Sequence, residues 1–184
     1  ENGVDGLRMD GKDEIRSIEP DSAGIRGVFS PNTGIIDYQE VTQSYAEDFK
    51  DSGGEIVLDA TVKDISRSSG KLIIESTKGD FSAKHIVNCA GLYADKIAEM
   101  MGEKLDVRII PFRGEYFLIN PESSTNVNGL IYPVPDPKMP FLGVHLTRRI
   151  DGAVEAGPSA VMAFRREGYR KRDFHFKEFF ETLS

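Results

Sequence analysis

The stretch His85-Ile-Val-Asn-Cys-Ala-Gly91, followed by Leu92-Tyr-Ala-Asp-Lys-Ile-Ala-Glu-Met-Met-Gly102, decides the predicted fold class. The apolar run over residues 85–90 has the composition of a buried strand that ends at Gly91. A helix is predicted over residues 93–101 and closes at Gly102. Strand, glycine turn and helix in this order bring backbone amides to an anionic ligand in α/β proteins. The sequence therefore predicts an α/β (α+β) fold.

Upstream of this stretch, turn residues divide the chain into short elements. Asp37 is expected to cap a helix over residues 38–51, because apolar side chains recur there every four residues and two glycines follow. A shorter acidic helix is expected before Pro20, and strands are expected between the turns. The predicted ranges are residues 10–19 for the acidic helix and 25–30, 55–58, 60–66, 71–76 and 80–84 for the strands.

The second half of the chain is richer in β-forming residues. The composition suggests an antiparallel sheet built onto the α/β element, with the change near residues 102–106. We therefore divide the chain approximately into a mixed region, residues 1–105, and a β-rich region, residues 106–184, and expect the chain to cross between them more than once. The expected strands are 107–119, 130–134, 141–147 and 153–156, with a terminal helix over 174–183.

Composition excludes several classes of function. The hydrophobic content of 39% predicts a globular protein with a real core, and no apolar run reaches the length of a membrane span. The net charge of −7 argues against a nucleic-acid partner. The basic cluster over residues 165–172 is expected to be a solvated face. The single cysteine, Cys89, excludes an internal disulfide and a Cys-based zinc site, and it favours a reducing, cytoplasmic compartment.

Local motifs do not identify a reaction. No two of the 18 glycines form a G-x-G pair, so the dinucleotide fingerprint G-x-G-x-x-G is absent, as is a phosphate-binding loop. The string Gly157-Pro-Ser-Ala-Val161 misses the serine-hydrolase elbow, because valine stands where glycine is required. The three histidines lie far apart and share no metal-ligand spacing. The chain also begins without Met, so we expect a piece of a longer protein.

Longer strings carry a resemblance. The sequence resembles the L-2-hydroxyglutarate oxidase/dehydrogenase family of the FAD-dependent D-amino-acid-oxidase superfamily, and the likeness spans essentially the whole chain. Upstream strings match the wider superfamily, and three central strings match the family in order and spacing. The upstream strings are Pro31-Asn-Thr-Gly-Ile-Ile-Asp-Tyr38 and Val87-Asn-Cys-Ala-Gly91, and the central ones are Ile110-Pro-Phe-Arg-Gly-Glu-Tyr116, Leu130-Ile-Tyr-Pro-Val-Pro-Asp-Pro137 and Pro140-Phe-Leu-Gly-Val-His-Leu-Thr147.

The resemblance implies a flavoenzyme of which this chain is a part. Members hold FAD noncovalently and oxidise L-2-hydroxyglutarate to 2-oxoglutarate. They are longer than this chain, with an N-terminal G-x-G-x-x-G turn and a C-terminal glycine-rich flavin contact that do not occur here. The implied fold is part of a FAD-binding domain plus an antiparallel-sheet substrate-binding domain with flanking helices. We therefore expect the piece alone to bind FAD weakly or not at all and to be inactive. The parent is expected in the cytoplasm or peripherally at a membrane, with oxygen or a quinone as electron acceptor.

Three residues are candidates for cofactor contact. In relatives the strand that contains Val62 lies beside the adenine, although Val62 could equally be an ordinary β-branched strand residue. Ala90 and Gly91 let the backbone approach a phosphate or flavin without an intervening side chain. The alternative is that they form only a tight turn.

Oxidation of a 2-hydroxy acid needs a base for the hydroxyl proton and donors for the carboxylates. His145 is the candidate base, because imidazole titrates near neutral pH, although a lone histidine in an apolar strand is often a core residue. Tyr116 is a candidate active-site side chain. Arg113 could bind a substrate carboxylate or pair with Glu115, and strand alternation places it opposite Tyr116 unless Gly114 marks a bulge.

Three further residues are weaker candidates for the substrate site. Tyr132 could contact the substrate, but packing is the simpler role. Arg148 and Arg149 could meet the distal carboxylate, but we expect them at the surface. Two rival functions stay open: oxidation of an amino acid or secondary amine, which needs no histidine base, and a non-catalytic binding module.

Overall fold

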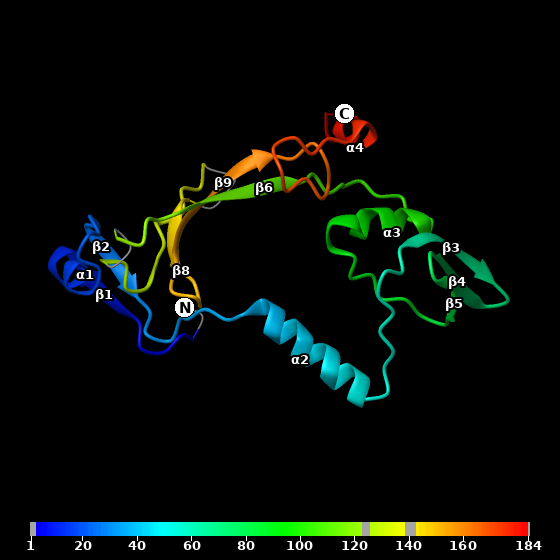
Figure 1. The fold of residues 1–184 in the computed structure, drawn as a ribbon, viewed down its shortest axis with the longest axis horizontal. Helices are drawn as coiled ribbons and strands as arrows, with labels where there is room; N and C mark the ends of the chain where they lie inside the picture. Colours follow the sequence, from blue (N-terminus) through cyan, green and yellow to red (C-terminus); the bar gives the residue numbers. More distant parts are fainter. Residues whose placement is uncertain (1–2, 123–125, 139–142, 184) are drawn as a thin grey trace. The chain divides into compact units, whose positions relative to one another are not determined.

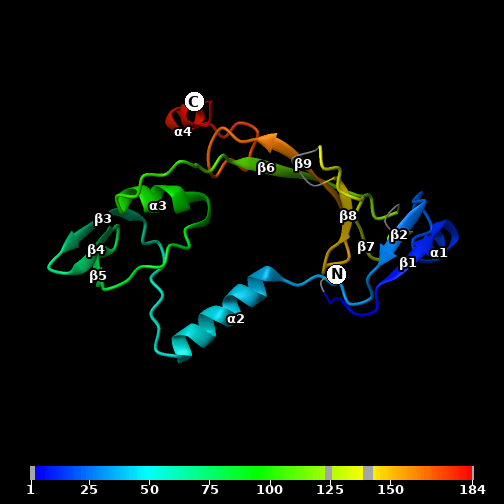
Figure 2. The same ribbon diagram turned by 180° about the vertical axis from the view of Figure 1, so that it is seen from behind.

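The computed structural model describes residues 3–122, 126–138 and 143–183, and Figures 1 and 2 show its ribbon from the front and from behind. Two compact units divide the chain, and each is built from two separate segments. Unit 1 contains Glu1–Ser44 and Gly114–Val161, and unit 2 contains Tyr45–Arg113 and Met162–Ser184. The division into residues 1–105 and 106–184 stays a prediction, since compact units and the domains of a longer protein need not coincide.

A small β-α-β element opens unit 1. Strand β1 (Arg8–Gly11) pairs antiparallel with β2 (Arg26–Phe29), and helix α1 (Lys12–Ile18) connects them and packs on both. Ile15 of α1 lies so close to Gly27 that a Cβ there would be 3.3 Å from its Cδ1 atom. The predicted acidic helix and the strand after it are confirmed.

The larger sheet of unit 1 has four strands in the order β6-β9-β8-β7. Strands β7, β8 and β9 pair antiparallel, so the predicted antiparallel sheet is confirmed. Val154, the first residue of β9, is fully buried. The sequence predicted β6 too long and β9 too short, and residues 141 and 142 of a predicted strand lie outside the described residues. The strand bounds are β6 (Phe112–Leu118), β7 (Leu130–Ile131), β8 (His145–Arg148) and β9 (Val154–Met162).

Helix α2 (Tyr38–Asp51) has the bounds that the sequence predicts. The Asp37 Oδ1 atom accepts hydrogen bonds from the backbone N–H groups of Gln39 at 2.8 Å and Glu40 at 3.3 Å, which confirms the predicted cap. Gly53 follows the helix with a φ of 86°, a backbone conformation that glycine adopts at low cost. Local sequence therefore specifies this helix at both ends.

Unit 2 contains an antiparallel meander and two short helices. Ile65 and Leu72 are buried in the meander, and helix α3 packs on its first strand. The predicted strands at 60–66, 71–76 and 80–84 are confirmed, as are the helices near 93–101 and 174–183. The bounds are β3 (Val62–Ser68), β4 (Lys71–Ser76), β5 (Gly79–Ala83), the 3₁₀ turn η1 (Gly91–Tyr93), α3 (Ala94–Met100) and α4 (Phe176–Leu183).

Two predicted strands are wrong. Residues 55–58 and 85–90 form no strand, and Leu58 and Val87 are 75% and 85% exposed. A strand forms when a neighbour accepts its backbone hydrogen bonds and covers its side chains. No described segment pairs with either run. The strand that should precede the Gly91 turn is therefore not formed here.

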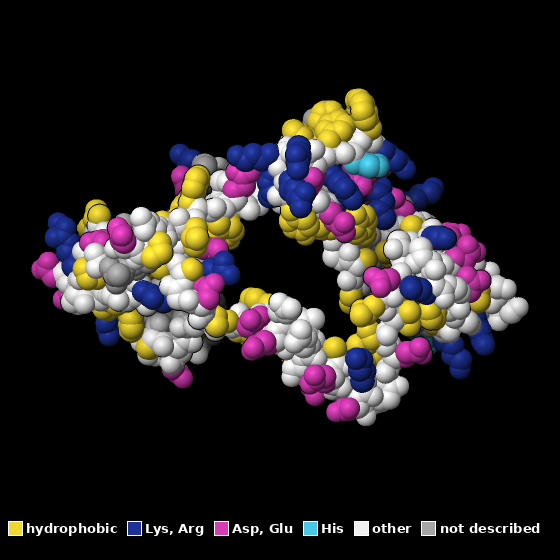
Figure 3. Space-filling view, in the orientation of Figure 1, with side chains coloured by type: hydrophobic (Ala, Val, Ile, Leu, Met, Phe, Trp, Pro, Cys, Tyr) yellow, Lys and Arg dark blue, Asp and Glu magenta, His cyan; other side chains and the backbone are white. Residues whose placement is uncertain are grey.

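The observed core is smaller than the composition predicts. Large apolar side chains are exposed over both units, as the yellow areas of Figure 3 show. None of the described helices is long and apolar enough to cross a membrane. The buried apolar residues among those described are Ile65, Leu72, Val127, Val154 and Ala163.

Candidate functional site

A groove of about 720 Å³ lies in unit 1, on one side of the four-stranded sheet. It is lined by the loop over residues 33–38, by the neighbouring parts of β7, β8 and the turn that follows, and by Tyr116 and Glu155. Five of the candidate site residues line it together: His145, Tyr116, Tyr132, Arg148 and Arg149.

His145 occupies a restrained position in this groove. Its side chain is 9% exposed, and its Nδ1 atom lies 3.4 Å from the carbonyl oxygen of Gly143. The ring of Tyr132 lies 4.7 Å from the imidazole centroid, tilted by 34°, and the ring of Tyr116 lies 6.3 Å away, edge-on at 70°. When Nδ1 carries the proton, that N–H donates to Gly143, and Nε2 keeps a lone pair that can accept a proton.

Gly157 positions two residues of the site, and the sequence analysis did not single it out. It pairs with His145 across β8 and β9. A Cβ at Gly157 would lie 2.6 Å from Cδ1 of Tyr116 and 2.9 Å from the carbonyl oxygen of Glu115. The absence of a side chain therefore lets the Tyr116 ring lie on β9. A glycine inside a strand is a signal of such a close approach, and this signal was available in the sequence.

Replacing Gly157 by Ala is expected to destabilise the strands β6 and β9 by about 1–3 kcal/mol, because the new methyl group overlaps the Tyr116 ring. Hydrogen exchange of peptides from these strands in the full-length protein measures the effect. Gly34→Ala is the matched control, since a Cβ at Gly34 would meet nothing within 4 Å. Equal exchange in the two variants would show that Tyr116 does not pack on Gly157.

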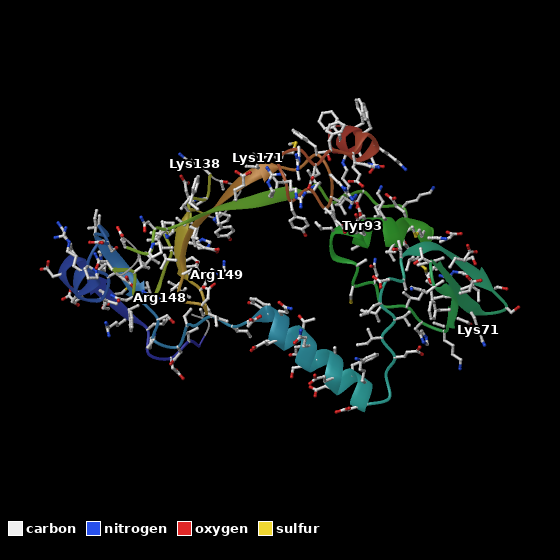
Figure 4. The ribbon with its side chains drawn as sticks, in the orientation of Figure 1. Lys71, Tyr93, Lys138, Arg148, Arg149 and Lys171 are labelled. Carbon is white, nitrogen blue, oxygen red and sulfur yellow. The ribbon has the colours of Figure 1, made fainter. Side chains whose placement is uncertain are left out.

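The two arginines that line the groove, Arg148 and Arg149, have different partners, and Figure 4 labels both. The guanidinium of Arg148 donates from Nε and Nη2 to the carbonyl oxygen of Val127, with an Nε–oxygen distance of 3.0 Å. Arg149 pairs through Nη1 with Glu155 at 2.9 Å and through Nη2 with Asp151 at 3.2 Å. Its hydrogen bond to Glu155 and then the charge of Asp151 raise the pKa of Arg149. Arg149 is thus a permanent cation held by two carboxylates.

Arg113 lies elsewhere, in unit 2. Its Nη1 atom donates to the carbonyl oxygens of Gly168 at 3.1 Å and Arg170 at 3.2 Å. These bonds tie the strand start to the loop after β9, and Arg113 does not line the groove. Its role in substrate binding stays a prediction.

The candidate cofactor residues Val62, Ala90 and Gly91 lie in unit 2. Gly91 has a φ of 54°, and a Cβ there would meet nothing within 4 Å. Asn88 fixes the turn, because its side chain accepts from the Ala90 N–H at 3.2 Å and donates to the Ala94 carbonyl at 2.8 Å. Helix α3 packs on β3, the strand that begins at Val62. The open backbone at Gly91 fits close approach by a large ligand, as the flavin nucleotide would require.

A second, smaller cavity of about 210 Å³ lies in unit 2, and the residues of an ion-pair network line it. Arg166 donates from Nη1 and Nη2 to the two oxygens of Asp95, each at 2.7 Å, and both side chains are buried. Arg166 also donates to the carbonyl oxygen of Leu92, and its backbone N–H donates to Glu178 at 2.7 Å. The predicted solvated face over residues 165–172 is therefore wrong at Arg166. This position joins α3 to the segment before α4.

Comparison with known proteins identifies the family of the chain. A family described as FAD dependent oxidoreductase matches residues 1–182. The chain is 50% identical to an L-2-hydroxyglutarate dehydrogenase of Indibacter alkaliphilus, over 100% of this chain and 46% of that protein. It is 48% identical to one from Escherichia coli, over 93% and 41%, and 44% identical to the mitochondrial one of Homo sapiens, over 95% and 40%. The chain thus spans less than half the length of these relatives.

Solved structures show the same fold. The L-α-glycerophosphate oxidase of Mycoplasma pneumoniae with FAD bound superposes with a TM-score of 0.73 at 22% identity, over 91% of this chain and 45% of that one. The L-proline dehydrogenase of P. horikoshii superposes with a TM-score of 0.61 at 18% identity, over 98% and 48%. The chain therefore belongs to the FAD dependent oxidoreductase family.

Proposed function

We propose that the full-length protein carrying this chain oxidises L-2-hydroxyglutarate to 2-oxoglutarate with FAD, and that the groove of unit 1 forms part of its substrate site. One observation carries the proposal: His145 is 9% exposed and contacts two tyrosine rings in a groove that arginine also lines. The names of the curated relatives support this choice of substrate.

The reaction removes two electrons and two hydrogen nuclei from the substrate. The Cα–H bond breaks with its electron pair, and the hydroxyl proton leaves as the C=O bond forms. When bound, FAD supplies the acceptor for the hydride. Nε2 of His145 would take the hydroxyl proton, and the contact of Nδ1 with the Gly143 carbonyl would orient the ring. Tyr116 and Tyr132 limit the access of water to the imidazole.

The cofactor proposal rests on unit 2. Val62, Ala90 and Gly91 would contact FAD through the backbone, and the open conformation of Gly91 favours this role. These positions could contribute only part of a binding site, because the chain has no G-x-G turn for a pyrophosphate.

The test uses the full-length protein, purified and held without oxygen. We expect L-2-hydroxyglutarate to bleach the visible flavin bands rapidly, and the D-enantiomer to leave them unchanged. Flavin that stays oxidised with L-2-hydroxyglutarate would disprove the substrate, and bleaching by amino acids or secondary amines would instead favour the amine-oxidising alternative. A protein without flavin would disprove the redox function itself.

A further inference from the structure

We propose that Arg149 binds the distal carboxylate of the substrate and so sets a preference for a five-carbon dicarboxylate. The inference rests on the proposed function, because it names the part of that same groove that recognises the end of the substrate remote from the reacting carbon.

Strand geometry places Arg149 on the same face as His145. Side chains two residues apart share one face of a strand, so His145, Thr147 and Arg149 point to one side. The backbone N–H of Arg149 donates to the Ala153 carbonyl at 2.7 Å, which continues the pairing beyond the end of β8. Glu155 pairs with Thr147 in the register, lines the groove and holds the guanidinium. The sheet therefore presents Arg149 to the groove.

Arg148 also lines the groove, but the strand register assigns its side chain to the face opposite His145. Its partner in the register is Val154, which is fully buried, and its guanidinium is bound to the carbonyl oxygen of Val127. Of the two arginines that the sequence offered for the distal carboxylate, Arg148 thus anchors the fold. Arg149 is 50% exposed and can meet a ligand.

The spacing suits a short dicarboxylate. Four residues of strand separate the Cα atoms of His145 and Arg149 by about 13 Å. The terminal carbons of a five-carbon chain lie about 5 Å apart, from four bonds of about 1.5 Å. The His145 and Arg149 side chains can span the difference between these two distances, so that one ligand contacts both the imidazole and the guanidinium.

The charges that line the groove also favour Arg149 as the residue that binds the distal carboxylate. The groove lining contains the carboxylates of Asp37, Asp151 and Glu155, so a dianionic ligand needs a cation there. Guanidinium has five N–H donors, and the two ion pairs of Arg149 use one donor from each terminal nitrogen. Asp151 is 58% exposed and lies 3.2 Å away, an exposed pair of small net stability. A ligand carboxylate can replace Asp151 while Glu155 keeps the guanidinium in position.

The test measures binding to the oxidised full-length holoenzyme from the perturbation of its flavin spectrum. The probes are 2-oxoglutarate and 2-oxopentanoate, which differ at the distal carboxylate. Arg149→Met should weaken the binding of 2-oxoglutarate about 10- to 100-fold, the effect of losing a charge-assisted hydrogen bond. It should change the affinity for 2-oxopentanoate less than about threefold. Arg149→Lys should recover part of the loss. Arg26→Met, which removes an exposed cation in β2 of the same unit, is the matched control.

Two outcomes would overturn the inference. Equal weakening of both probes would mean that Arg149 only shapes the groove, and unchanged binding of both would place the distal carboxylate elsewhere. The proposed function is judged separately, by bleaching of the wild-type flavin with L-2-hydroxyglutarate. If that bleaching fails, the comparison of the two probes still decides whether Arg149 recognises a carboxylate.

Discussion

Replacing His145 by Gln should slow flavin reduction by L-2-hydroxyglutarate by about 10²- to 10⁴-fold, the usual contribution of a positioned general base. Glutamine can keep a donor for the Gly143 carbonyl, but it cannot take the hydroxyl proton at neutral pH. The loss should therefore fall on the rate of the reductive step at saturating substrate, with a much smaller change in the apparent substrate affinity.

Rapid mixing of the anaerobic full-length protein with substrate measures this step directly. His85→Gln is the matched control, because His85 is exposed in unit 2 and lies outside the groove. A primary isotope effect with substrate deuterated at C2 would show that bond breaking at that carbon limits both proteins. A reductive rate in His145→Gln within threefold of the wild type would remove His145 from the role of base.

Elements with signals inside their own sequence were predictable. Helix α2 carries its cap at Asp37, its apolar period and its terminal glycine, and its predicted bounds agree with the structure. The meander of β3, β4 and β5 is likewise set by short-range turns, such as the one at Ser69 and Gly70, where both residues have positive φ. Such elements need few distant contacts.

Features that depend on distant residues were not predictable. The run over residues 85–90 has the composition of a buried strand, but a strand exists only where another pairs with it. Arg166 lies in a basic cluster that resembles a solvated face. It is nevertheless only 7% exposed, because it forms a buried ion pair with Asp95, which lies 71 residues away in the sequence. Within the candidate site, His145 could be proposed from its chemistry, whereas its contacts with Tyr132 and the packing of Tyr116 on Gly157 required the sheet register.

The ion pair of Asp95 and Arg166 should dominate the local stability of unit 2. Asp95→Asn or Arg166→Met is expected to cost about 3–5 kcal/mol, because each leaves a buried charge without its counter-charge. Hydrogen exchange of peptides covering α3 and residues 163–168 in the full-length protein measures the free energy of local opening. Peptides from the β1–α1–β2 element of unit 1 should keep their wild-type exchange.

A neighbouring ion pair gives the matched control for this prediction. Lys96 pairs with Glu99 and Glu181, each at 3.3 Å, and its side chain is 32% exposed. Lys96→Met should therefore cost less than about 1 kcal/mol. The double variant Asp95→Asn with Arg166→Met should be less destabilised than the sum of the single changes, because it removes both charges together. A sum that is strictly additive would contradict a direct interaction.

The pair also predicts how stability depends on pH. Burial, the largest influence on Asp95, opposes its ionisation, but hydrogen bonds from Arg166 and from the Ile109 N–H outweigh burial and lower the pKa of Asp95 below 3.8. A carboxyl group with a lowered folded-state pKa stabilises the fold fully above its unfolded value and loses that contribution as the pH falls through the folded value. The gap in opening free energy between wild type and Asp95→Asn should therefore be constant from about pH 5 to 8 and close only below about pH 4. A gap that closed near pH 6 would assign the stabilisation to another group.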